Sequence, residues 1–101
     1  MTLWRCRMTI VNSSRTAGLF AESSGWKRTL GAAHIEWLEL AVHRDVCQFE
    51  SDHENPVESL KRLSRRWPTL IFLLDYENER NRIRGLVKAK AGEVEHCEIG
   101  Y

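Results

Sequence analysis

The chain has 101 residues, 43% of them hydrophobic and 29% charged, and its 15 lysines and arginines nearly balance 14 aspartates and glutamates. This length fits a single domain over residues 1–101, and the composition is typical of a globular protein, which excludes a disordered or fibrous chain. A net charge of +1 argues against strong non-specific nucleic-acid binding, and no apolar run approaches the roughly 18 residues of a membrane-spanning helix.

The first element is a strand near the start of the chain. Apolar residues occupy every second position from Trp4 to Ile10, with polar residues between them. This period of two predicts a half-buried strand. The segment from residue 13 to residue 33 is rich in glycine, serine and alanine, and its composition favours a short helix with a long loop.

Two extended segments follow. Residues 37–42 are largely apolar, and residues 46–51 form the expected returning strand, with Cys47 and Phe49 facing inward. The polar residues 43–45 between them form the expected turn of a hairpin. One continuous strand and a helix over residues 34–43 are the alternatives.

The clearest local signal is a helix over residues 55–67. Asn55 is a favoured N-cap residue, and Pro56 suits the first helical position. Apolar residues then recur at helical spacing and form one stripe. Pro68 disfavours helical geometry at the residue before it, so the helix is expected to end there.

The rest of this helix surface is basic and is a candidate binding surface. It suits phosphate groups or an acidic protein, whereas the ordinary interpretation is a solvated helix exterior. No aromatic residue alternates with the cations, so a stacking platform for single-stranded nucleic acid is not indicated. Trp26 lies in a loop-like basic segment and would be a binding hot spot if partly exposed; folding back onto the core is its alternative. The candidate partner-binding residues are Trp26, Lys61, Arg62, Arg65 and Arg66.

The last third of the chain predicts a three-stranded meander. Residues 70–76 carry apolar side chains on both faces, which predicts a strand inside a sheet that is covered at least partly on both sides. A polar loop at residues 77–81 leads to a second strand over residues 82–90. A turn at Ala91-Gly92 then leads to a third strand over residues 93–101.

Alternation in the last strand predicts Cys97, Ile99 and Tyr101 facing inward and His96 and Glu98 facing outward. In the strand before it, Gly85 indicates a large neighbouring side chain, and Trp67 is the suggested neighbour.

The three cysteines are odd in number, far apart and without a CxxC pair. This pattern favours free thiols in a reducing compartment. Arginines inside the apolar start of the chain are unlike a signal peptide, so a cytoplasmic location without membrane attachment is expected. Cys6, Cys47 and Cys97 each fall on a predicted inward position, and we interpret them as small core residues.

The order of elements predicts an α+β sandwich, in which two helices lie on one face of a largely antiparallel sheet of four to six strands. We find no nucleophile motif, phosphate-binding loop or metal-ligand spacing, so no enzyme activity, metal or cofactor is expected. The acidic cluster around His53 precedes a helix, where carboxylates are favoured electrostatically.

A family resemblance rests on three segments. They are W-R-C-R-M-T-I at residues 4–10, C-Q-F-E-S-D-H-E-N-P at residues 47–56 and L-S-R-R-W-P-T-L-I-F-L-L-D-Y-E-N-E at residues 63–79. With the Gly85 that follows, they resemble the YubB-type ferredoxin-like family of small plasmid and phage proteins, whereas residues 13–45 depart from it. The resemblance implies a ferredoxin-like sandwich and a mobile-element origin. The family is similar in having no established activity, so no catalytic residue carries over.

These observations favour a non-enzymatic binding protein of phage or plasmid type, which acts by occupying a host protein or nucleoprotein complex. An anti-CRISPR inhibitor of a CRISPR-Cas effector is the sharpest form of this hypothesis. The first alternative is a nucleic-acid-binding regulator that uses the basic helix. The second is a small metal-dependent enzyme built around Asp52, His53 and His96. A monomer and a dimer are both compatible with the sequence.

Overall fold

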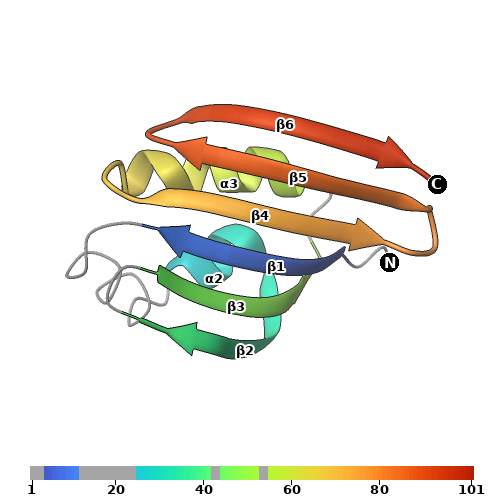
Figure 1. Cartoon of the computed structure of the whole chain (residues 1–101), viewed down its shortest axis with the longest axis horizontal. Coiled ribbons are helices and arrows are strands. Elements are labelled where there is room, and N and C mark those ends of the chain that lie inside the picture. The colour runs from blue at the N-terminus through green and yellow to red at the C-terminus, as the bar shows by residue number, and fades with distance from the viewer. Residues whose placement is uncertain (1–3, 12–24, 42–43, 53–54) are drawn as a thin grey trace.

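The computed structural model describes residues 4–11, 25–41, 44–52 and 55–101. In this part of the chain, six strands form one antiparallel sheet in the order β2-β3-β1-β4-β5-β6, and two helices pack against it (Figure 1). The elements are β1 (Trp4–Val11), α2 (Gly25–Leu30), β2 (Ala32–Leu40), β3 (Arg44–Ser51), α3 (Pro56–Arg66), β4 (Ile71–Asn78), β5 (Ile83–Lys90) and β6 (Glu93–Gly100).

Both helices lie on the same face of the sheet, and they contact each other (Figure 1). The predicted α+β class, the antiparallel sheet and the helices on one face are therefore confirmed. The predicted hairpin is also confirmed, since β2 pairs with β3, but Arg44 and Asp45 belong to β3 and not to the expected turn, and residue 43 lies outside the described residues. The alternative of a helix over residues 34–43 is wrong, because residues 34–40 belong to a strand. The strand β2 begins earlier than predicted. Its start could not be recognised in the sequence, because register shifts after Ala33 and Trp37 interrupt the alternation of apolar and polar residues.

The core lies between the helices and the sheet. Inward side chains of β1 and β4, among them Met8, Ile10, Phe72 and Leu74, are fully buried. Burial of one such side chain contributes about 1.5–3 kcal/mol. The four tryptophans all contact this core, since Trp4 and Trp26 are buried and the other two pack against it partly exposed. The prediction of a half-buried first strand is confirmed.

The helix α3 follows its sequence signals closely. The Asn55 side-chain oxygen accepts a hydrogen bond from the Glu58 backbone N–H at 3.1 Å, and Pro56 occupies the first turn. At the other end, the Trp67 N–H donates to the Leu63 carbonyl, and the helix stops before Pro68 as expected.

A buried serine ties α3 to the turn between β5 and β6. The Ser64 hydroxyl donates to the Lys61 carbonyl at 2.8 Å and accepts from the Gly92 N–H at 2.9 Å. Ala91 and Gly92 both have positive φ, as a two-residue hairpin turn requires. The predicted turn is confirmed, and the serine contact fixes it under the helix.

The predicted partial exposure of Trp26 is wrong. Trp26 belongs to α2 and is 1% exposed, with edge-to-face contacts to Trp37 and Phe49 at centroid distances of 5.8 and 5.9 Å. Trp26 and Leu30 are four residues apart and share the buried side of the helix. Trp26 therefore supports the core, as the alternative interpretation had it, and cannot serve as an exposed hot spot.

The predicted phase of the last strand is also wrong. Gly85 of β5 faces the helices, and it pairs with Glu98, whereas the outward Leu86 pairs with Cys97. Cys97 and Ile99 are consequently exposed on the face away from the helices. The error arose because the apolar residues of this strand do not keep one parity, and the cross-strand register decides instead.

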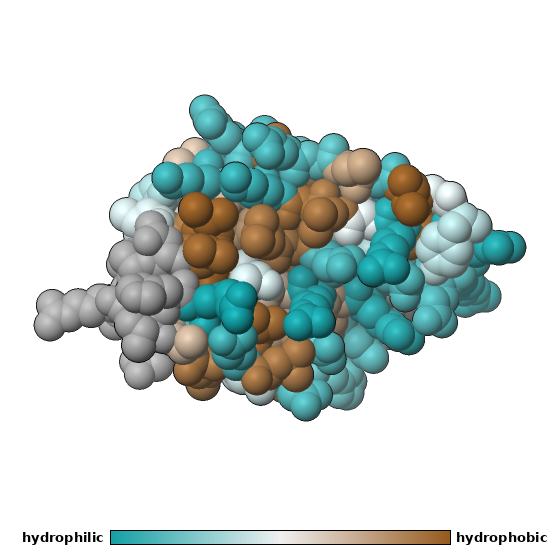
Figure 2. Space-filling view, viewed as in Figure 1, coloured by the Kyte–Doolittle hydropathy of each residue, from teal (hydrophilic) through white to brown (hydrophobic). Residues whose placement is uncertain are grey.

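The second face of the sheet carries neither described helix (Figure 1). We call it the open face. Figure 2 views it directly and shows apolar and polar side chains gathered in separate areas. Ile71 and Leu73 of β4 lie on it half-buried, so the predicted cover on both sides of this strand comes only from neighbouring side chains in the described structure.

Candidate functional site

The outer side of the two helices carries six cations, and we call it the cationic helix surface. All lie outside the core, and Lys61 is half-buried whereas the other five are exposed. The surface consists of Lys27, Arg28, Lys61, Arg62, Arg65 and Arg66.

Three of these cations surround one groove. Arg28 of α2 and Arg62 and Arg66 of α3 line a hollow of about 350 Å³, together with Gly25 and Thr29. Among the described residues, no carboxylate lines it, and none of the three arginines forms an ion pair. Guanidinium groups bind carboxylate and phosphate groups through paired hydrogen bonds. The arrangement is therefore suited to an anionic group.

The other predicted cations are placed differently. The Arg65 stem lies against the β5–β6 turn, where a Cβ on Gly92 would be 2.9 Å from the Arg65 Cγ. This is the packing role expected of an arginine stem. The structure thus brings Arg62 and Arg66 together, sets Arg65 apart and adds Arg28. Sequence reasoning missed Arg28 because α2 has six residues, too few for a helical period to be read.

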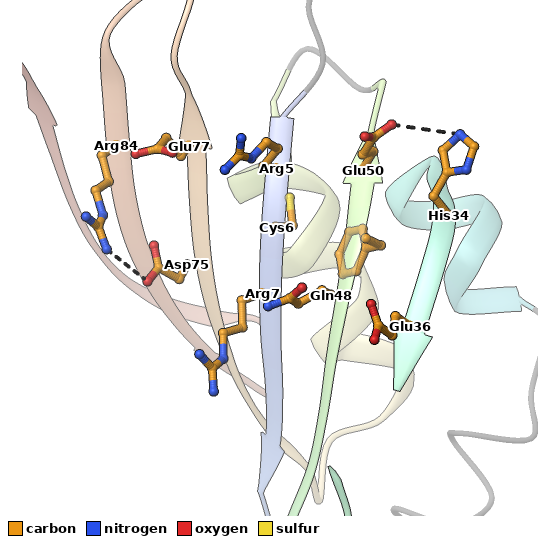
Figure 3. Close-up of a pocket in the computed structure, with 11 residues that line it drawn as sticks. Arg5, Cys6, Arg7, His34, Glu36, Gln48, Glu50, Asp75, Glu77 and Arg84 are labelled. Carbon is orange, nitrogen blue, oxygen red and sulfur yellow. Dashed lines mark ion pairs between the residues drawn. The ribbon is translucent and has the colours of Figure 1, made fainter. Parts of the chain in front are cut away.

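The open face carries a shallow trough of about 380 Å³ (Figure 3). Charges alternate in sign across one row of neighbouring strands, in the order Glu50, Arg5, Glu77, Arg84. The dashed lines in Figure 3 mark the ion pairs Arg84–Asp75 at 3.7 Å and His34–Glu50 at 3.9 Å. These pairs are well exposed, so each contributes at most about 1 kcal/mol and mainly fixes cross-strand register.

Cys6 borders this trough, but its side chain belongs to the core on the helix side of β1. Cys6 is buried, and burial, with a smaller effect of Cys47, raises its pKa to about 12. The thiolate, rather than the thiol, is the reactive form of cysteine. Cys6 is therefore a core residue, as predicted, and so is the fully buried Cys47.

A second cluster, unforeseen from the sequence, lies on the helix side of the outer strands. The Tyr76 hydroxyl donates to Glu98 at 2.7 Å and lies 2.5 Å from the His96 Nε2. A hydroxyl has one proton, so the His96 Nε2–H must donate to the tyrosine oxygen. Burial, reinforced by Glu98, raises the pKa of Tyr76 above its ordinary value. These hydrogen bonds satisfy a buried hydroxyl and fix the edge strand β6 to β4 across β5.

The residues suggested for a metal-dependent enzyme are not brought together. Asp52 follows β3 and His96 lies in β6, with β1, β4 and β5 between them. At about 4.8 Å per strand, these two strands are on the order of 19 Å apart. His53 lies outside the described residues, among which no three His, Cys, Asp or Glu side chains form a metal-binding group.

Neither described helix is long and apolar enough to cross a lipid bilayer. Comparisons of the chain with protein-family models, with curated proteins and with solved structures gave no match. The resemblance to the YubB-type family, drawn from the sequence alone, therefore stays a prediction.

Proposed function

We propose that this chain is a non-enzymatic binding protein that occupies the surface of a host macromolecule through its cationic helix surface. The observation that carries the proposal is the convergence of Arg28, Arg62 and Arg66 on one groove, which no carboxylate of the described part of the chain lines. Like charges held close together repel one another, and an anionic group placed among them relieves this repulsion. Such a groove is most favourable when a partner fills it.

An acidic surface of a protein or nucleoprotein complex is the partner class that we favour. The chain as a whole has a net charge of +1, and bare nucleic acid is bound best by proteins with a large cationic excess. On this chain six cations form a local patch on the outer side of the helices, among them Lys27 and Arg28 on α2 and Arg62 on α3. A local patch of this kind fits a bounded acidic surface better than a continuous phosphate backbone.

The biological setting is part of the same proposal. The order β2-β3-β1-β4 with helices after β1 and β3 supports a ferredoxin-like assignment, to which β5 and β6 add a hairpin. The resemblance to plasmid and phage proteins supports a mobile-element origin and action in the host cytoplasm. A CRISPR-Cas effector is the partner we propose first, because it is a nucleoprotein that such elements gain by inhibiting.

The proposal can be tested by phage plating on cells with an active CRISPR-Cas system that express the chain. The wild-type chain should restore plating and should co-elute with the effector complex. The double reversal Arg62→Glu with Arg66→Glu should abolish both effects. Arg80→Glu is the matched control, since Arg80 is an exposed arginine in the β4–β5 loop.

If the Arg62→Glu, Arg66→Glu variant still inhibited the effector fully, the cationic helix surface would be excluded as the binding surface. Failure of the wild-type chain to bind any effector type would remove the proposed partner. The nucleic-acid-binding alternative predicts that the chain alone binds labelled DNA or RNA, with an affinity that falls steeply as salt rises. Fluorescence anisotropy at low salt distinguishes these two functions.

A further inference from the structure

The two middle strands of the sheet carry an ordered pattern on the open face. Strand β1 has two cations at one end and a polar and an apolar residue at the other, and β4 has two anions and two apolar residues in the matching positions. Each of these four β1 residues is paired in the sheet with one of the four β4 residues. The pairs are Arg5 with Glu77, Arg7 with Asp75, Thr9 with Leu73, and Val11 with Ile71.

This pattern is complementary to itself. Strands β1 and β4 are the third and fourth of six, so a line between them, parallel to the strands, divides the sheet in half. Consider a twofold rotation axis that runs parallel to this line, just above the open face. It generates a second molecule whose β1 lies over β4 of the first. Each cation of β1 then faces an anion, and each apolar or polar residue at the other end faces an apolar one. We propose that the open face binds a second copy of this chain in this orientation.

The neighbouring strands fit the same arrangement. The same twofold axis that places β1 opposite β4 of the second copy also places β3 opposite β5. Glu50 then faces Arg84 of the second copy. Leu86 of β5, which is 56% exposed on the open face, would become covered. Its large exposure in the single chain is the kind of apolar surface that marks an interaction site.

The orientation is specific. A half turn about a line across the strands would instead place Arg5 and Glu77 on the apolar ends of the second copy, leaving charges buried without partners. At the outer strands Glu39 would face Glu95 of the second copy. Glu39 is already paired with Arg44 of its own chain at 3.1 Å, and exposed charges at the rim of an interface are screened by salt. The favourable contacts lie on the four central strands.

The available area is sufficient for a stable complex. The molecule measures 38 × 26 Å in its two longer dimensions, and a specific interface covers roughly 800 Å² of each partner. Apolar contacts supply most of the affinity, whereas the paired charges select the orientation. The two helices lie on the opposite side of the sheet, so a dimer of this kind leaves the cationic helix surface exposed on both outer sides.

Arg7 and Asp75 provide the sharpest test, because reversing them separates contacts within a chain from contacts between chains. Sedimentation equilibrium of the full chain over micromolar to millimolar protein should show a wild-type dimer. A twofold dimer contains the contact between Arg7 of one chain and Asp75 of the other twice. Arg7→Glu alone would therefore create two contacts between like charges, and so would Asp75→Arg alone. Each should raise the dimer dissociation constant by at least about tenfold. An equimolar mixture of the two variants should form a heterodimer of nearly wild-type affinity, because the carboxylate introduced in one variant then faces the guanidinium introduced in the other.

Arg62→Glu, on the helix side, is the matched reversal and should dimerise like the wild type. Urea unfolding of each variant shows that loss of association is not loss of folding. A wild-type chain that stays monomeric at millimolar protein overturns the proposal. So does a dimer that is unaffected by both reversals, which would indicate pairing through an edge strand. A mixture that does not restore association overturns the proposed orientation.

Discussion

Tyr76 lies directly over Gly85, its opposite residue in the β4–β5 pair, and a Cβ built on Gly85 would be 2.1 Å from the tyrosine Cζ. The absence of a side chain at this position lets the tyrosine ring cross β5. Its hydroxyl thereby reaches His96 and Glu98 on the edge strand. The three atoms nearest to this Cβ all belong to Tyr76 and none to Trp67, the neighbour suggested by the sequence.

Gly85→Ala should therefore destabilise the fold by about 2 kcal/mol or more, because the ring must move and lose its hydrogen bonds. Gly100→Ala is the matched control, since its Cβ would meet only the Arg82 carbonyl oxygen at 3.7 Å. Urea unfolding measures both variants. Equal free energies of unfolding for the two would contradict this account of Gly85.

Tyr76→Phe should lower the free energy of unfolding by about 1 kcal/mol at neutral pH, because it removes a hydrogen bond to a carboxylate that is itself exposed. The pKa of Tyr76 is raised above its ordinary 10.0 in the folded chain, so the folded state keeps a proton that the unfolded chain loses at higher pH. The stability that depends on this proton is present below pH 10.0 and is lost as the pH rises above it.

The wild type should accordingly lose more stability than Tyr76→Phe between neutral pH and a pH above 10.0. Cys6 and Cys47, whose pKa values burial raises to about 12, contribute equally in both proteins. The difference between the two urea-unfolding series thus reports Tyr76 alone. Parallel series would show that the tyrosine is not protected from ionisation.

The three thiols should differ in reactivity. Cys97 is exposed, whereas Cys6 and Cys47 are buried with raised pKa values, and only an accessible thiolate reacts rapidly. A chromogenic disulfide reagent should modify one thiol quickly in the native chain and all of them in urea. Cys97→Ser should remove the fast phase, and a fast phase that survives this substitution would contradict the strand register of β6.

The N-cap of α3 should contribute measurably to stability. Asn55→Ala removes the acceptor for the Glu58 N–H and should lower the free energy of unfolding by about 1 kcal/mol. Asn55→Ser keeps a capping oxygen and should cost much less. If both substitutions had the same effect, another group would have to satisfy that N–H.

Much of the fold could be predicted because its signals are local. The N-cap at Asn55, the stop at Pro68 and the alternation from Trp4 to Ile10 each depend on residues adjacent in sequence. The face of Cys97 could not be predicted, because strand register across the sheet decides it and its own strand alternates poorly. Tyr76 and its partners were missed for a related reason, since their contact spans three strands.

The candidate site was predicted in part. Helical spacing placed Arg62 and Arg66 on the outside of α3, and the structure confirms their exposure. Arg28 joins them only through the packing of α2 against α3, a tertiary contact that no local pattern indicates. Trp26 was misplaced because its helix is too short to be recognised, and its indole packs into the core instead.

The groove formed by Arg28, Arg62 and Arg66 is the receptor for anionic groups on which the proposed function depends. Its most direct test is a nuclear magnetic resonance titration of the ¹⁵N-labelled chain with an acidic peptide, following the arginine Nε–Hε signals. We expect the signals of Arg28, Arg62 and Arg66 to shift together and saturate, while the Arg80 signal does not. Shifts that are absent, or that are the same for Arg80, would contradict the proposed function.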